Sequence, residues 1–102
     1  MTTEEFAALA LAFPNSEASP HFDRVAFKVI GKRIFATLHE KSNSVNIKLT
    51  PTEQIEFCEF QPKAISPVPN KWGEQGWTTF MLSFADEAAI KAALETAYNQ
   101  VL

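Results

Sequence analysis

The sequence predicts an α+β fold, a two-layer sandwich in which helices cover one face of an antiparallel sheet. Apolar residues recur with helical spacing in three separate segments, and short runs between these segments alternate apolar with polar residues, as strands do. The length of 102 residues suits one domain, 1–102, with a single two-layer core. The expected order of elements is α-β-β-β-α-β-β-α.

The first helix is expected over residues 3–13. Thr2 and Glu5 have the spacing of a capping box, and Pro14 ends the helical pattern. Residues 15–23 are rich in Ser, Asn and Pro and show no period, which indicates a connector. The apolar positions expected to face the sheet are Phe6, Leu9, Ala10 and Phe13.

Two strands, 24–30 and 33–39, are expected to form a β-hairpin. Gly31-Lys32 between them favours a two-residue type II′ turn, and this turn determines the register. The register gathers an apolar face by pairing Ile30 with Arg33, Val29 with Ile34, Phe27 with Ala36 and Val25 with Leu38. The opposite, polar face pairs Arg24 with His39, Ala26 with Thr37 and Lys28 with Phe35.

A third strand is expected after a turn at residues 40–44. Val45, Ile47 and Leu49 alternate with polar residues, so that Lys48 joins the polar face of the hairpin.

The second helix is expected to begin at Thr50, where an N-cap, Pro51 and Glu53 provide three start signals together. Its inward residues are expected to be Ile55 and Cys58. The remaining elements are an edge strand at 64–68, a strand at 77–82 and a final helix after Asp86. The last helix carries the apolar stripe Ile90, Ala93, Leu94, Ala97, Tyr98 and Val101.

The segment 67–79 holds both tryptophans and two of the three glycines. Gly73 and Gly76 indicate a loop with backbone angles that other residues avoid, and Trp77 is expected to pack as a structural residue at the start of a strand. The loop has the outline of the Gly-x-x-Gly loop of KH domains, but the helices that flank that loop are absent here.

Charge is segregated along the chain although the net charge is only -3. The segment 24–49 contains six basic residues and one acid, Glu40, whereas the rest of the chain contains three basic and eleven acidic residues. Such segregation is typical of a docking surface.

Several classes of protein are excluded or disfavoured. No apolar run approaches the roughly 18 residues of a membrane span, and the start of the chain lacks a basic leader region, so a cytoplasmic protein is expected. The single cysteine, Cys58, allows no internal disulfide. His21 and His39 are too few for a zinc site, and no catalytic triad can be argued. We therefore expect no metal, no cofactor and no enzymatic activity.

The chain resembles the MmcQ/YjbR-like family from about Phe6 to its end. The resemblance implies a secretion-chaperone-like two-layer fold and DNA binding through a pair of hairpin wings, without an established active site. The motifs that carry it are Phe13-Pro14, Ser19-Pro20-His21-Phe22, Ala26-Phe27-Lys28-Val29, Gly31-Lys32, Phe35-Ala36-Thr37-Leu38 and Lys71-Trp72-Gly73-Glu74-Gln75-Gly76-Trp77-Thr78.

The leading functional hypothesis is a non-enzymatic domain, monomeric or dimeric, that contacts the phosphate backbone of duplex DNA through the basic hairpin face. A solvated polar sheet face with no partner is the competing interpretation. The residues predicted to bind nucleic acid are Arg24, Lys28, Lys32, Arg33, Phe35, Lys48 and Lys71.

Two alternatives stay open. The acidic stripe of Glu53, Glu56 and Glu59 is suited to a protein-binding adaptor or chaperone-like module. An enzyme would need a closed pocket with convergent polar groups, for example around His21, Lys71 and Trp72.

Overall fold

The structure is a computed structural model that describes residues 1–102 as six strands and four helices. In chain order these are α1 (Thr3–Ala12), β1 (Ser16–His21), β2 (Arg24–Val29), β3 (Ile34–His39), β4 (Ser44–Lys48), α2 (Pro51–Phe60), β5 (Ile65–Pro67), α3 (Lys71–Glu74), β6 (Trp77–Met81) and α4 (Glu87–Val101).

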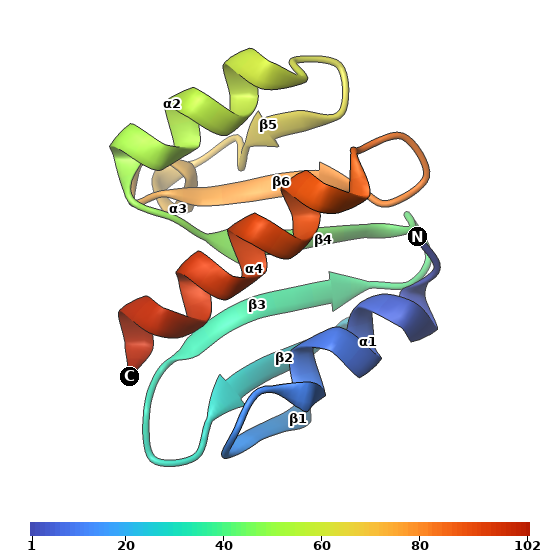
Figure 1. Ribbon diagram of the computed structural model, residues 1–102, viewed down its shortest axis with the longest axis vertical. Coiled ribbons are helices and arrows are strands. Elements are labelled where there is room, and N and C mark those ends of the chain that lie inside the picture. The colour runs from blue at the N-terminus through green and yellow to red at the C-terminus, as the bar shows by residue number, and fades with distance from the viewer.

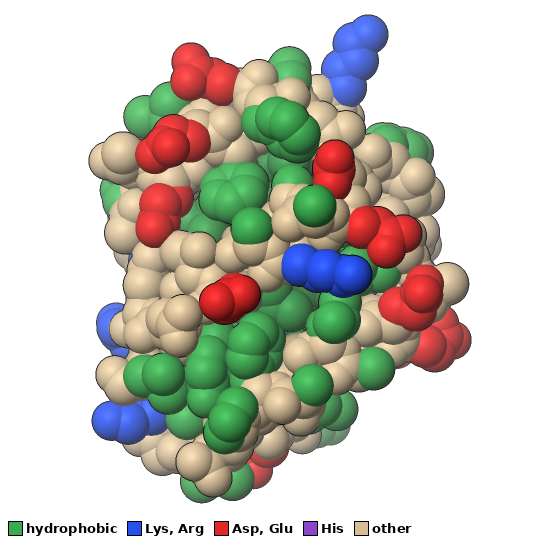
Figure 2. Space-filling view, in the orientation of Figure 1, with side chains coloured by type: hydrophobic (Ala, Val, Ile, Leu, Met, Phe, Trp, Pro, Cys, Tyr) green, Lys and Arg blue, Asp and Glu red, His purple; other side chains and the backbone are tan.

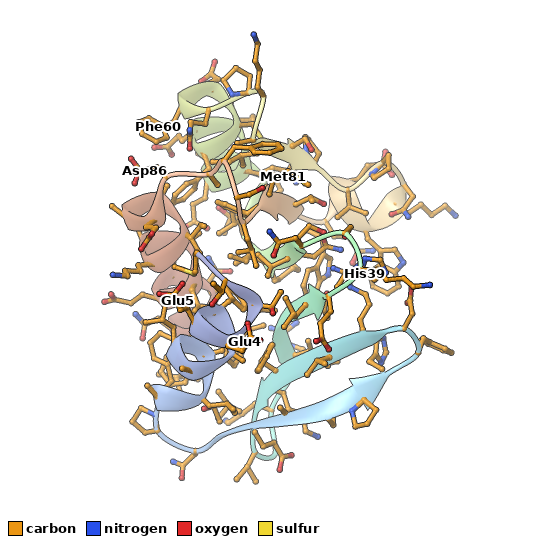
Figure 3. The ribbon with its side chains drawn as sticks, turned by 90° about the vertical axis from the view of Figure 1, so that its right-hand side faces the viewer. Glu4, Glu5, His39, Phe60, Met81 and Asp86 are labelled. Atoms are coloured by element: carbon orange, nitrogen blue, oxygen red, sulfur yellow. The ribbon has the colours of Figure 1, made fainter.

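The six strands form one antiparallel sheet in the order β1-β2-β3-β4-β6-β5. Helices α1, α2 and α4 lie along one face of this sheet (Figure 1). The short helix α3 projects on the opposite side (Figure 3). The α+β class, the two-layer arrangement and the order of the predicted elements are therefore confirmed, and β1 and α3 are additions to that order.

Strand β1 replaces the connector predicted for residues 15–23. It pairs with β2 along its whole length, from Ser16 opposite Val29 to His21 opposite Arg24. The segment has neither alternation nor β-branched residues, so local pattern could not reveal it. Backbone hydrogen bonding to the edge of β2 determines its conformation, and its position as an edge strand accommodates a proline.

The β2–β3 pairing follows the predicted register only in part. Val25 lies opposite Leu38 and Phe27 lies opposite Ala36, as expected, but a bulge after Phe27 places Lys28 opposite Ile34. The turn also begins earlier than predicted, because the amide of Lys32 donates to the carbonyl of Val29 at 2.8 Å. Gly31 has φ +77 at the third position of this turn, as a type II turn requires, so the predicted type II′ turn is wrong.

The altered register moves Phe35 from the polar face into the core. Its side chain is 0% exposed and meets Phe13 and Tyr98 edge-on, with ring centroids 6.2 and 5.7 Å away. The prediction that Phe35 contacts nucleic acid is therefore wrong. The bulge leaves Phe35 as the extra, unpaired residue of β3, and Phe35 turns inward while Ile34 lies on the open face.

The helix signals are confirmed by the caps. Thr2 and Thr50 both form complete capping boxes, and Asp86 accepts from two backbone amides of α4. All six predicted stripe residues of α4 are buried. They pack against the inward residues of the strands in one core cluster, in which the largest fully buried side chains are Phe6, Phe27, Phe35, Phe80, Ile47, Leu49, Ile65, Leu82, Ile90 and Leu94.

The inward-facing prediction for Ile55 is wrong, whereas Trp77 begins β6 as expected. Ile55 is 58% exposed, while its neighbour Gln54 is buried and its amide nitrogen reaches oxygens of α3 and β6. Trp77 is only half-buried and lies on the open side of the sheet, because Thr78 and Phe80 occupy the inward positions of β6. Cys58 is half-buried.

The burial of Phe35 generates a stability prediction with a matched control. Phe35→Ala should lower the free energy of unfolding by about 3–5 kcal/mol, because it empties a fully enclosed site. Phe22→Ala removes the same atoms from a side chain that is 96% exposed and should leave stability nearly unchanged. Chemical denaturation of both variants measures the difference, and equal losses would contradict the burial of Phe35.

Candidate functional site on the open face of the sheet

The charges divide between the two sides of the molecule. Seven of the twelve acids lie on α1, α2 and α4, whereas Lys91 is the only one of the nine basic residues on these helices. Acidic side chains accordingly outnumber basic ones on the helix-covered face (Figure 2). In the side view Glu4 and Glu5 lie on the helix side and His39 lies towards the other (Figure 3). The sheet side is therefore the more basic half of the protein.

The open face of the sheet contains a hollow of about 360 Å³. It lies between the β1–β2 hairpin and the segment around α3, both of which project beyond the sheet on the side away from the helices (Figure 3). Its walls combine four apolar side chains with polar ones. The lining residues are His21, Arg24, Ile34, Thr37, Asn46, Val68, Asn70, Trp72 and Trp77.

Close backbone contacts hold the α3 side of the hollow. A Cβ at Gly73 would lie 1.8 Å from the carbonyl oxygen of Val68, and a Cβ at Gly76 would lie 1.8 Å from that of Leu49. Gly76 also has φ +105, a conformation that only glycine adopts readily. Asn70 caps α3 by accepting from the amide of Trp72 at 2.9 Å. These contacts place Trp72 at the rim, where its side chain is 59% exposed.

Arg24 supplies the main charge inside the hollow. Its Nε donates to Thr37 Oγ1 at 2.8 Å, whereas its Nη2 is buried and has no hydrogen-bond partner in the protein. Burial lowers the pKa of Arg24, and Asp23 opposes this effect, but a guanidinium remains protonated in proteins. The group is therefore a desolvated cation with an unused donor.

The sequence-predicted cations are not equivalent in the structure. Lys28 forms an ion pair with Glu17 at 3.7 Å, and Lys48 donates to the carbonyl of Gln75 at 2.6 Å. Burial lowers the pKa of Lys48, and the nearby charge of Arg33 lowers it further. Exposed cations remain at the β2–β3 turn and on α3, namely Lys32, Arg33 and Lys71.

The two histidines have different surroundings. His21 lines the hollow and is exposed, with its ring edge-on to Phe22. His39 lies between Asp23 and Ser42, 3.0 Å from Asp23 Oδ2 and 2.6 Å from Ser42 Oγ.

No group of three or more His, Cys, Asp or Glu side chains comes together in a way that could hold a metal ion. None of the helices has the length and apolar character needed to cross a bilayer.

Sequence reasoning grouped His21 and Trp72 with Lys71 around a possible pocket and assigned Arg24 separately to the basic hairpin face, whereas the structure brings His21, Trp72 and Arg24 together at the hollow. It missed Asn46, Asn70 and Ile34 as lining residues, since β1 and the bulge after Phe27 determine which side chains meet there. Lys71 does not line the hollow. The alternation of Asn46 with Val45 and Ile47 was the one available signal that it faces the open side.

The YjbR family model matches residues 11–100 of this chain. The structure is similar to the crystal structure of the Deinococcus radiodurans protein DR2400, which has a DUF419 domain. The two are 21% identical, the match covers 95% of this chain and 75% of the other, and the TM-score is 0.80. A Pseudomonas syringae protein of known structure is 14% identical over 100% of both chains, with a TM-score of 0.75. At these identities the likeness shows a shared fold. No curated protein matches the chain significantly.

Cys58 on α2 should be a slow nucleophile. Burial raises the pKa of its thiol, so less thiolate is present at any pH below that pKa than in an exposed cysteine. Alkylation by iodoacetamide near neutral pH should therefore be slower for the folded protein than for a short cysteine peptide. The denatured protein is the control and should react at the peptide's rate. Faster labelling of the folded state would show an activated cysteine instead.

Proposed function

The chain belongs to the YjbR family, as the resemblance in its motifs predicted, and we propose that it is a non-enzymatic DNA-binding domain. Its contacts are made to the phosphate backbone by cations around the open face of the sheet. The resemblance implies this role, and the surface of the protein supplies its physical support.

The division of charge is the observation that carries the proposal. Eight of the nine basic residues lie outside the three covering helices, so a polyanion meets an attractive surface on the sheet side and a repulsive one on the helix side. Such a field orients the protein during encounter even though its net charge is -3. Phosphate contacts by lysine and arginine provide most of the affinity in sequence-independent binding.

The proposal assigns the phosphate contacts to the cations that are exposed and not already engaged. Lys32 and Arg33 are exposed in the β2–β3 turn, and Arg33 acts electrostatically on Lys48, which in turn bonds to Gln75 next to α3. The turn and α3 therefore lie at the same end of the sheet. Lys32, Arg33 and Lys71 together form the cationic rim at this end. Lys28 and Lys48 contribute charge but are already engaged, and Phe35 takes no part.

A binding role suits the hollow better than catalysis. Its lining includes no carboxylate and no cysteine, so it offers neither a pair of carboxylates for general acid–base work nor an activated nucleophile. Thr37 already accepts a hydrogen bond from Arg24, and His21 is the only histidine in the lining.

A protein-binding adaptor is the second candidate. Ile55 and Phe60 are exposed on α2 beside Glu56 and Glu59, which is a combination suited to a basic, amphipathic partner helix. Substituting Ile55 and Phe60 by serine should leave DNA binding unchanged, because α2 lies on the covered face. Failure of the protein to bind DNA at low salt would leave this adaptor role as the better proposal.

The DNA proposal predicts a modest salt dependence. Three phosphate contacts, by Lys32, Arg33 and Lys71, give a slope of log affinity against log salt of about -2.7. Changing Lys32 and Arg33 together to Glu should weaken binding at least about tenfold at low salt and reduce the slope towards about -0.9. Fluorescence anisotropy with a labelled duplex measures both quantities.

The control variant carries Lys63→Glu and Lys91→Glu, which changes the net charge equally. Lys91 lies on α4 and Lys63 follows α2, so this pair should reduce binding far less than the rim pair. All four side chains are exposed, and neither variant should shift the melting temperature. Equal losses of affinity in both variants, or no binding by the parent protein, would overturn the proposal.

A further inference from the structure

The polar groups of the hollow are predominantly hydrogen-bond donors. Arg24 contributes an unpartnered Nη2. Asn46 uses its oxygen to accept from Thr79 Oγ1 at 2.7 Å, and Asn70 uses its oxygen to accept from the amide of Trp72 at 2.9 Å. Both asparagines therefore direct their acceptors into the protein and keep their amide nitrogens for another partner. A ligand that fits these groups must present acceptors.

The walls of the hollow are apolar and aromatic. Ile34, Val68, Trp72 and Trp77 line it, and Trp72 stands at the rim with most of its indole exposed. An exposed indole beside an apolar cavity is suited to stacking on a flat ring. The volume of about 360 Å³ lies at the lower end of the range for small-ligand sites, about 300–1,000 Å³. An isolated phosphate would leave these walls uncovered.

We propose that this hollow binds a single unpaired nucleobase that presents hydrogen-bond acceptors, with guanine as the best fit. The inference rests on the proposed function, because the phosphates on either side of such a base would lie along the cationic rim. Stacking on Trp72 would hold any base, since every base has an aromatic face. Arg24 would then choose among the bases.

Arg24 is arranged to discriminate. Its Nε is held by Thr37, so the guanidinium has a determined orientation, and its Nη2 is enclosed and has no partner in the protein. Guanine offers two adjacent acceptors, O6 and N7, which match the arginine fork. Adenine presents an amino group in place of O6 and would oppose a donor with a donor. Guanine should therefore bind at least about fivefold more tightly than adenine.

The test uses the intrinsic fluorescence of the protein, since its only two tryptophans both line the hollow. Titration with guanosine monophosphate should quench this fluorescence in a saturable manner, adenosine monophosphate should bind at least about fivefold more weakly, and ribose phosphate should produce no quenching. Absence of saturable quenching by guanosine monophosphate, or equal quenching by ribose phosphate, would overturn the proposal.

Arg24→Met is the decisive variant, and Lys41→Met is its charge-matched control in the β3–β4 turn. Arg24→Met should abolish the preference for guanine, whereas Lys41→Met should retain it, because Lys41 does not line the hollow. An apolar replacement removes a buried donor that has no partner but also the hydrogen bond from Nε to Thr37, and because these effects oppose each other Arg24→Met should fold with a nearly unchanged melting temperature. If Arg24→Met does not fold, Trp72→Ala replaces it as the test variant, because Trp72 is exposed. Trp72→Ala should abolish the saturable quenching by guanosine monophosphate. Retention of the guanine preference in Arg24→Met, or of tight binding in Trp72→Ala, would contradict the assignment.

The duplex measurement separates this inference from the proposed function. A duplex has no unpaired base, so its binding by the rim cations should be unaffected by Trp72→Ala. Duplex binding without quenching by guanosine monophosphate would overturn the base site alone. Quenching without any binding of duplex or single-stranded DNA would overturn the link to a nucleic-acid surface, since the hollow would then be a site for free nucleotides.

Discussion

The close approach of two glycines to neighbouring backbone shapes the functional side of this protein. Gly73 lies against the carbonyl of Val68, Gly76 lies against that of Leu49, and neither site has space for a Cβ. Between these contacts the amide of Gln54 reaches the carbonyls of Gly73 and Trp77 from the other side of the sheet. This junction turns α3 away from the helix layer and onto the open face. Without it the sheet would present a flat polar surface and no hollow.

The same junction connects the helix layer to the sheet layer, which differ in charge and in exposure. The helix layer buries the apolar face of the sheet and carries most of the acids, and the sheet layer keeps its second face open. Small antiparallel sheets commonly leave one face to solvent. Here that face also contains a desolvated arginine with a buried, unpartnered donor, which costs free energy of roughly 1–3 kcal/mol in the unliganded protein. Costs of this kind tend to concentrate at binding sites.

Sequence reasoning succeeded where structure depends on neighbours along the chain and failed where it depends on neighbours in space. The capping boxes at Thr2 and Thr50 and the stripe of α4 are local signals, and all are confirmed. Strand β1 has no such signal, because its pairing with β2 determines its conformation. The bulge leaves Phe35 without a partner in the pairing of β2 with β3 and so changes the facing of Phe35 and Ile34, which a regular period of two could not predict.

The buried face of α2 shows the same limit more sharply. Ile55 is the more apolar residue, yet Gln54 is buried, because its amide nitrogen donates to the carbonyl of Gly73 on α3 and to the hydroxyl of Thr78 on β6. Hydrophobicity alone could not identify that position.

Under the two proposals, the rim would provide affinity for nucleic acid and the hollow would provide selectivity for a base. In the proposed function, exposed cations such as Lys32 and Arg33 would act over about a Debye length, 8–10 Å in ordinary salt, and would govern encounter and affinity without regard to sequence. Arg24 acts only at hydrogen-bond distance and, because Thr37 holds it, only on a ligand of matching geometry. The affinity of the rim would decline with added salt, whereas the selectivity of the hollow would depend on salt less, because a hydrogen bond at contact distance is much shorter than the Debye length. On the two proposals together, the surface would associate broadly with a polyanion and still distinguish the places where a base is unpaired.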